Sequence, residues 1–280
     1  MNELLVKINF LIPMLPRAEK CFAQALVENP EAISHMTLAE IAKESNSSDA
    51  SIIRFCKRLG YHGYLELKAA VASALSQEKT VFEGNVSSAD TIEDIMKKVF
   101  QSNVQTLQNT MVMADENYQK AVDALVNAKS IHFFGVGDAY AACQFTFMKF
   151  CRLGVISSAQ SDVMMQFTVA NNLGPGDVAL AVSYEGRSRN VVQAMSIAKK
   201  RGATTICITK MSKSPLLKYT DIPLYIAIND LSVDREKVTR RVADQFVLDI
   251  LYLGYINQKK QDFSKCLKRN QITIDYNKIK

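Results

Sequence analysis

The sequence predicts an all-α region followed by an α/β domain in which a five-stranded parallel sheet is doubly wound. Every segment before residue 77 has helical character, whereas after residue 113 short β-branched apolar runs alternate with helical stretches. This alternation is typical of parallel β-α-β units. The 280 residues, 48% of them hydrophobic, are enough for two cores of ordinary size.

Composition limits the class of protein. The six cysteines include no C-x-x-C pair, and only three histidines are present, so we expect reduced thiols, no metal site and no histidine dyad. No uncharged apolar run of about 18 residues occurs, and the N-terminus lacks the cleavage site of an export signal. We therefore expect a cytoplasmic protein that does not contact the membrane.

The first region contains two short helices joined by a tight turn. Thr37-Leu38-Ala39-Glu40 has the form of a capping box, which predicts a helix from Leu38 to about Glu44. Ser45-Asn46-Ser47 forms the turn, and Ser48 can cap a second helix that Gly60 ends. Two helices with so short a connection match a helix-turn-helix, which makes all of residues 1–77 the expected domain.

The second of these helices is amphipathic and carries three cations. Arg54 shares a face with Lys57 and Arg58. Cations on such a face can neutralise DNA phosphates, and an arginine can form two hydrogen bonds with a guanine. The alternative is a helix that simply faces solvent, because cations near a helix C-terminus are favoured by the helix dipole.

The overall charge does not by itself favour nucleic acid. The net charge is +6, but residues 255–280 hold seven Lys/Arg and two Asp/Glu, so +5 of it lies in the C-terminal tail. A DNA-binding function must therefore rest on the local arrangement of cations. We interpret the tail as a solvated end rather than a phosphate-binding arm.

The second region begins after a linker. Residues 78–90 are rich in small and polar residues and lack helical periodicity, and a helix is expected over 91–113 within the domain 91–280. A C-terminal helix is expected over 236–256. The five expected strands are Ile131–Phe134, Val155–Ser157, Val178–Val182, Thr204–Thr209 and Leu224–Ile228.

A glycine loop follows the first strand. Gly135 and Gly137 allow a sharp turn and a close approach of backbone amides to a ligand. A dinucleotide fingerprint would need a third glycine at the position of Tyr140, and an acidic residue about 20 positions further on. Neither is present, so we expect no nicotinamide cofactor.

A second loop, Ser183-Tyr184-Glu185-Gly186-Arg187-Ser188, follows the third strand and leads into a helix over Asn190–Lys200. Hydroxyls and amides at a helix N-terminus, beyond the end of a parallel strand, form an anion cradle. An ordinary capped loop is the alternative.

The helix-turn-helix segment resembles a known family. T-L-A-E-I-A followed by S-x-A-S-I-I-R-F-C-K-R-L-G-Y-H-G-Y-L-E-L-K is similar to the signature of the RpiR-type bacterial transcriptional regulators, over about residues 5–75. Ser47 departs from the apolar turn residue usual there. The resemblance implies binding to a double-stranded DNA operator. The residues expected at this interface are Thr37, Ser48, Asp49, Ala50, Ser51, Arg54, Lys57, Arg58 and Tyr61.

In that family a SIS (sugar isomerase) domain follows, and the two loops resemble its phosphosugar-binding loops, over about residues 115–255. The resemblance implies that the hydroxyls of Ser183 and Ser188 hold phosphate. Ala139 and Glu185 stand where the family commonly has serines. The residues expected to line a sugar-phosphate site are Gly135, Gly137, Ala139, Ser183, Glu185, Gly186, Arg187 and Ser188.

Glu185 matters most among these departures, because a carboxylate about 4 Å from a phosphate repels it by several kcal/mol at intermediate dielectric. Arg187 and Arg189 can offset this, by pairing with Glu185 or by binding the phosphate. We therefore expect a sugar-phosphate effector. The alternative is a sugar without phosphate, or an amino sugar whose ammonium pairs with Glu185.

Catalysis is not expected, although SIS domains also occur in sugar-phosphate isomerases. Such an enzyme needs a base poised near neutrality. Glu185 lies next to the expected site, but His132, inside the first strand, is interpreted as a core residue.

A homodimer or a higher homo-oligomer is expected. The segment 238–256 carries apolar residues at 238, 242, 246, 250 and 253, with 243, 247 and 251 beside them, and this wide stripe needs a partner surface. The stripe can serve core packing or a dimer, and SIS proteins imply a dimer. A two-fold dimer would read a pseudo-palindromic operator.

Overall fold

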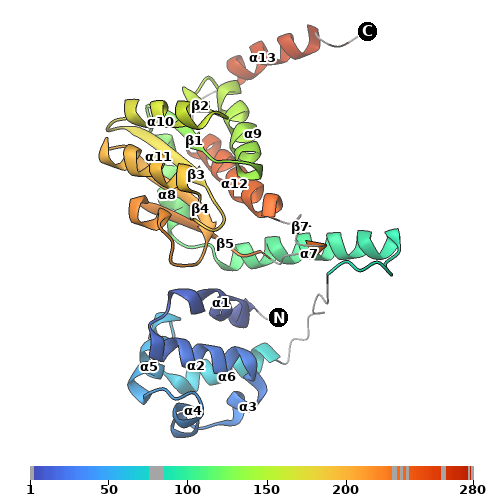
Figure 1. Cartoon of the computed structure of the whole chain (residues 1–280), viewed down its shortest axis with the longest axis vertical. Helices are drawn as coiled ribbons and strands as arrows, with labels where there is room; N and C mark the ends of the chain where they lie inside the picture. Colours follow the sequence, from blue (N-terminus) through green and yellow to red (C-terminus); the bar gives the residue numbers. More distant parts are fainter. Residues whose placement is uncertain are drawn as a thin grey trace.

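A computed structural model describes residues 3–75, 85–228, 232–233, 236–237, 240–259, 263–276 and 278 (Figure 1). Residues 3–75 form a helical region with its own core, in which Phe22 packs edge-on against Phe55 at 5.4 Å between ring centroids. Its elements are α1 (Glu3–Leu11), η1 (Ile12–Met14), α2 (Arg17–Glu28), α3 (Pro30–His35), α4 (Leu38–Glu44), α5 (Asp49–Arg58) and α6 (Tyr64–Leu75).

The expected helix-turn-helix is present in this region. Both hydrogen bonds of the capping box between Thr37 and Glu40 form, and the Ser48 side chain caps α5. Gly60, at φ +91°, adopts the left-handed conformation that lets the chain leave the helix. The hydroxyl group of the turn residue Ser47 donates a hydrogen bond to the carbonyl of Ala18 in α2, at 2.8 Å. This polar side chain therefore has a hydrogen-bond partner within the helical region.

The α/β region is a five-stranded, all-parallel sheet in the order β2-β1-β3-β4-β5. The strands are β1 (Ser130–Phe134), β2 (Ser157–Ala159), β3 (Asp177–Val182), β4 (Thr204–Lys210) and β5 (Ile222–Ile226). The helices around them are α8 (Asn117–Val126), α9 (Asp138–Arg152), α10 (Val163–Asn172), α11 (Arg189–Lys200), η2 (Leu216–Tyr219) and α12 (Arg240–Lys259).

The two faces of the sheet are covered by different helices, as a doubly wound sheet requires. Along β3, Val178, Leu180 and Val182 belong to the core formed with α8, α9 and α12. The alternate residues Ala179 and Ala181 belong to the core formed with α10, α11 and η2. This period of two follows from the pleat of the strand.

Two strands differ from their expected positions for identifiable reasons. β2 begins two residues later than expected, because the amide of Val155 bonds the carbonyl of Phe150 and so closes the C-terminus of α9. β5 lies two residues earlier than expected. It ends at Ile226 because both backbone groups of Ala227 bond the hydroxyl of Thr110.

The expected C-terminal helix over 236–256 is wrong at its start. Residues 236–237 form β7, which pairs with β6 (Ser232–Val233), and the helix runs from Arg240 to Lys259. The tail, expected as a solvated end, contains α13 (Ser264–Tyr276). Most of the expected linker, residues 78–84, lies outside the described residues, and 85–90 form turns without a helix or strand.

A long helix connects the two regions. α7 (Ile92–Val112) contacts α1 of the helical region as well as β5 and α12 of the α/β region, and Figure 1 shows it lying between them. Across the described ranges, no helix combines the length and the apolar character that a membrane crossing requires.

Candidate functional site

The two glycine-containing loops lie side by side at the carboxyl ends of β1 and β3. These strands are neighbours in the sheet, and the chain leaves β1 toward β2 on one side before it returns to β3 on the other. This is the topological switch point of the sheet, where doubly wound proteins bind ligands. The structure therefore brings together the loops that the sequence singled out.

The loop between β1 and α9 is shaped by its glycines. Gly135 packs so closely on the first turn of α9 that a Cβ atom would lie 3.0 Å from the backbone of Ala139. Gly137 has φ +58° and ψ −132°, and a Cβ atom there would meet nothing within 4 Å. Ala139 packs against the core, so its methyl group serves packing. The exposed Gly137 leaves open space in front of the helix N-terminus.

The loop between β3 and α11 is held by hydrogen bonds from the last two residues of β4. The carbonyl of Tyr184 accepts from the hydroxyl of Thr209 at 3.0 Å and from the amide of Lys210 at 2.9 Å. Gly186 adopts φ +61°, and a Cβ atom there would lie 2.3 Å from the hydroxyl oxygen of Ser214. A side chain at position 186 would therefore force the loop apart.

The N-terminus of α11 has no side-chain cap, which is also true of α2, α8 and α9. Ser188 is its cap residue, yet the side chain makes no capping hydrogen bond. In contrast, the side chains of Thr37, Ser48, Thr91 and Asp162 cap their helices. Amides at a helix N-terminus that lack a capping oxygen are suited to an anion. Ser183, the other expected hydroxyl, is buried at the start of the loop.

The charge of Glu185 is compensated by a residue that the sequence analysis did not identify. Its Oε2 lies 2.5 Å from Nζ of Lys210, the last residue of β4. Lys210 and Arg240 also lie over the ring of Tyr184, at 5.4 and 4.5 Å from its centroid. The loop thus has a cation beside its acidic residue. Lys210 therefore reduces the repulsion that Glu185 would exert on a phosphate.

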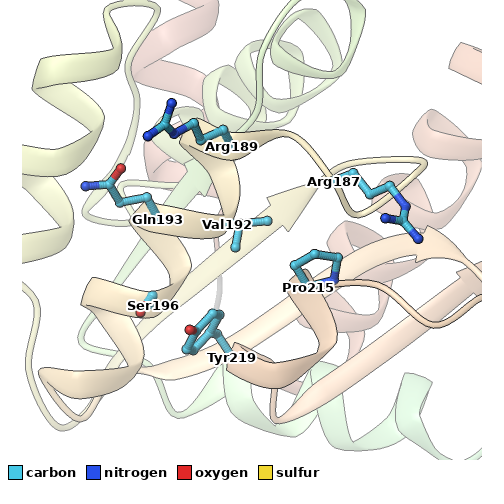
Figure 2. Close-up of a pocket in the computed structure, with 7 residues that line it drawn as sticks. All are labelled: Arg187, Arg189, Val192, Gln193, Ser196, Pro215 and Tyr219. Atoms are coloured by element: carbon cyan, nitrogen blue, oxygen red, sulfur yellow. The ribbon is translucent and has the colours of Figure 1, made fainter.

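Arg187 and Arg189, expected to compensate Glu185, instead line a groove of about 420 Å³ between α11 and η2. Figure 2 shows their side chains at opposite ends of this groove and directed away from one another. The groove also contains Val192, Gln193, Ser196, Pro215 and Tyr219. Of the two roles expected for these arginines, pairing with Glu185 is replaced by the pairing of Glu185 with Lys210, whereas phosphate binding stays a prediction.

His132 has hydrogen-bond partners within the strands, at a distance from both loops along β1. Its Nε2 lies 2.7 Å from the hydroxyl oxygen of Ser130, which donates to Asp177, and its Nδ1 lies 2.8 Å from the hydroxyl oxygen of Ser158. Burial lowers the pKa of His132, and the charge of Asp177 opposes this shift. This environment is that of a satisfied strand residue.

The expected DNA-contacting residues mostly lie on the surface of α5 and its neighbours. Exposed side chains are those of Thr37, Ser48, Asp49, Ala50, Arg54, Lys57 and Arg58. Tyr61 is half-buried against the core. Ser51, expected at base edges, is buried, and its hydroxyl accepts a hydrogen bond from Arg54 at 2.8 Å. The periodicity of α5 turns this residue toward the interior.

The three cations of α5 are not equivalent. The buried carboxylate of Glu19 in α2 accepts a hydrogen bond from Nε of Arg58 at 2.9 Å and lies 4.0 Å from Nε of Arg54. Arg58 is therefore held against α2, whereas Lys57 is exposed. Glu19 lies 35 residues before Arg54, and nothing local in the sequence indicated this contact.

Within the described residues, no group of three or more His, Cys, Asp or Glu side chains is placed to hold a metal ion.

Comparison with known proteins adds family relationships to this geometry. The family described as "Helix-turn-helix domain, rpiR family" matches residues 2–78, and the SIS domain family matches residues 124–248. An uncharacterized HTH-type transcriptional regulator of Caldanaerobacter subterraneus subsp. tengcongensis is 32% identical over 280 residues, which cover 100% of this chain and 99% of the relative. The HTH-type transcriptional regulator HexR of Pseudomonas aeruginosa is 30% identical and is covered over 94% of its length, against 96% of this chain.

Among solved structures, the Vibrio vulnificus NanR protein complexed with ManNAc-6P matches with a TM-score of 0.61 at 22% identity. The match covers 99% of this chain and 100% of that chain. The sugar isomerase domain of an RpiR transcription factor from Sphaerobacter thermophilus matches with a TM-score of 0.56 at 22% identity, over 63% of this chain and 98% of that chain. These likenesses show a shared fold.

Proposed function

This chain belongs to the RpiR family of helix-turn-helix transcriptional regulators with a SIS domain, and on that premise we propose that a sugar phosphate bound at the switch point controls its affinity for operator DNA. The observation that carries the effector proposal is the N-terminus of α11, where no side chain caps the helix and Lys210 compensates Glu185. A phosphate there gains helix amides and a nearby cation. The NanR complex with ManNAc-6P supports a sugar phosphate as the class.

The pairing of Glu185 with Lys210 also bears on the alternative effectors. An amino sugar would need a free carboxylate for its ammonium, but Glu185 already has a cationic partner at 2.5 Å. A sugar without phosphate would leave the N-terminal amides of α11 without an anion. Both alternative ligands would therefore make fewer favourable contacts with the loop than a sugar phosphate would.

We do not assign catalysis to this site. The carboxylate of Glu185 is engaged in an ion pair with Lys210, and His132 is bonded within the strands away from the loops. The relatives named above are transcriptional regulators. Conversion of any hexose phosphate by the purified chain would contradict this assignment.

The DNA contacts are assigned to the exposed end and face of α5. Ser48, Asp49 and Ala50 occupy the N-terminal end that enters the major groove in this motif, and Arg54 projects from the next turn. We assign Lys57 to phosphate contact, and Arg58 chiefly to positioning α5 against α2 through Glu19. Thr37 and Tyr61 flank this surface, with Thr37 at the capped end of α4.

Arg54→Ala tests this assignment. The substitution removes an exposed guanidinium from the recognition face, and operator binding is expected to weaken by about 1–3 kcal/mol while sugar-phosphate binding is unchanged. Fluorescence anisotropy with labelled operator measures the first, and calorimetry the second. Arg201→Ala, at the C-terminus of α11, is the matched control that also removes one exposed cation. Equal loss in both variants would refute the assignment.

The chain is proposed to act as a homodimer, with α7 rather than the expected stripe of α12 as a contact surface. In α12 the buried residues are Ala243, Asp244, Val247, Leu248, Leu251 and Tyr255, so positions 243, 247 and 251 of the expected stripe serve core packing. Positions 242, 246 and 250 are half-buried, 253 is exposed, and 238 lies outside the described residues. The buried face of α7 is polar, and its exposed face carries apolar side chains. Its buried residues are Ser102, Thr106, Asn109 and Thr110, whereas Ile92, Met96, Phe100 and Val104 are exposed.

A second copy of this chain is the occupant that fits the α7 stripe. Apolar residues every four positions form one continuous ridge, and the same ridge on a second molecule is self-complementary about a two-fold axis. A helix-turn-helix protein that reads two half-sites needs such an axis. The ridge also adjoins the helical region through the contact between α7 and α1, so dimer geometry and the placement of α5 are linked.

Phe100→Glu is expected to shift the chain toward monomers, because it places a charge in the centre of the ridge. Operator affinity should fall with it, since a monomer contacts one half-site. Light scattering coupled to size exclusion measures the oligomer. Ile272→Glu on α13, which is also an exposed apolar residue, is the control and should leave the oligomer intact. An unchanged oligomer in Phe100→Glu would exclude α7 from the interface.

A further inference from the structure

The groove between α11 and η2 combines apolar and cationic side chains on the surface of the α/β region. One wall is a single face of α11, with residues at the spacing i, i+3, i+4 and i+7, and the other wall belongs to η2 and the residue before it. The residues of these two walls are Arg189, Val192, Gln193, Ser196, Pro215 and Tyr219. Arg187, in the loop before α11, completes the groove.

The two arginines of the groove have no acidic partner within the described part of the chain. Arg187 and Arg189 are both exposed, and neither forms an ion pair there. Glu185, the acidic residue nearest to them in the sequence, is paired with Lys210 instead. A guanidinium group binds a carboxylate through two parallel hydrogen bonds. Each end of the groove can therefore bind a carboxylate of another molecule.

The charge around this groove is strongly biased. Residues 187–220 hold eight Lys/Arg and no Asp/Glu, whereas the other 246 residues hold 26 Lys/Arg and 28 Asp/Glu. This segment includes both walls of the groove. Its exposed cations are Arg187, Arg189, Lys199, Lys200, Arg201, Lys213 and Lys218. The surface that surrounds the groove is therefore complementary to an acidic partner.

The middle of the groove distinguishes between kinds of acidic partner. Figure 2 shows Val192 and Pro215 between the two arginines, with the ring of Tyr219 beside them. A nucleic-acid backbone offers phosphates but little apolar surface between them. A small dianion needs guanidinium groups that converge, whereas these two are directed away from one another. A protein segment can offer both carboxylates and an apolar side chain, and arginine and tyrosine are enriched at protein interfaces.

We propose that this groove binds an acidic segment of a partner protein, in which an apolar side chain lies between two carboxylates. The apolar side chain packs against Val192 and Pro215, and the carboxylates accept hydrogen bonds from Arg187 and Arg189. This interaction goes beyond the proposed function and does not depend on it, because the contact needs neither operator DNA nor a sugar phosphate.

Selection of random dodecapeptides displayed on phage, with the full chain as the target, tests the proposal. The enriched peptides should carry Asp or Glu on both sides of an apolar residue. Fluorescence anisotropy of the best labelled peptide then gives its affinity, which Arg187→Ala and Arg189→Ala should each lower about tenfold. Added salt should weaken the binding as well. Ser196→Glu, which places a carboxylate inside the groove, should repel the peptide.

Arg241→Ala is the matched control, because it removes an exposed arginine from α12, which covers the other face of the sheet, and it should leave peptide binding unchanged. The proposal is refuted if no peptide is enriched, if the enriched peptides lack acidic residues, or if Arg187→Ala and Arg189→Ala both bind them within twofold of the wild type. It is also refuted if these two variants lose affinity for random duplex DNA instead of peptide. None of these results bears on the proposed effector.

Discussion

Phe55→Ala is expected to unfold the helical region of residues 3–75 while the α/β region remains folded. Phe55 is fully buried and packs edge-on against Phe22, and its truncation to alanine is expected to cost about 3–5 kcal/mol. That is a large fraction of the stability of a region this small. Operator binding should be lost, because α5 carries the residue that is removed.

The structural reason for a local effect is that the cores are separate. The buried core that contains Phe55 is drawn from residues 5–71, whereas the two cores of the α/β region are drawn from residues 121–263. Hydrogen exchange measured by mass spectrometry reports the two regions separately. Phe150→Ala, at a fully buried position in α9, is the reciprocal control and should expose the α/β region instead. Simultaneous loss of protection in both regions would contradict independent cores.

Lys210→Met is expected to weaken sugar-phosphate binding by about 2 kcal/mol, or roughly 30-fold, after allowance for solvent screening. The substitution removes a cation at the phosphate loop and leaves Glu185 without the partner that lies 2.5 Å away. Both changes disfavour an anion at the N-terminus of α11. Calorimetry with the best-binding sugar phosphate measures the loss.

A double variant separates the two causes. Glu185→Gln combined with Lys210→Met removes the uncompensated carboxylate, and it should recover part of the affinity that Lys210→Met loses. Lys218→Met, on the exposed side of η2, is the control for removing a lysine and should bind as the wild type does. Unchanged affinity in Lys210→Met would mean that the phosphate lies elsewhere.

Much of the fold could be predicted because local signals agreed with one another. The capping box at Thr37 placed α4, and the positive φ of Gly60 ends α5 as expected. The errors arose where tertiary contacts decided the boundary. Val155 was assigned to a strand for its β-branched side chain, but its amide closes α9, and Ala227 leaves β5 because Thr110, over 100 residues earlier, binds its backbone.

The sites were predicted less completely than the fold, because the charged partners of the site residues lie on other helices and strands. The sequence identified both loops but missed Lys210, although it directly follows the expected fourth strand, whose end adjoins the third in a parallel sheet. Glu19 gave no such signal, because its importance depends on its burial against α5. Ser51 was assigned to DNA by position in the motif, whereas in the structure it is buried and its hydroxyl bonds Ser48 and Arg54.

We propose above that α5 binds specific DNA and that a sugar phosphate at the switch point changes this binding. The most direct measurement is a fluorescence anisotropy titration of the intact chain against DNA fragments from its own genomic surroundings, over a range of salt concentrations, with and without sugar phosphates. We predict that one fragment binds far more tightly than random DNA, that salt weakens this binding, and that one sugar phosphate shifts it severalfold. Equal binding of all fragments, unaffected by any sugar phosphate, would contradict the claim.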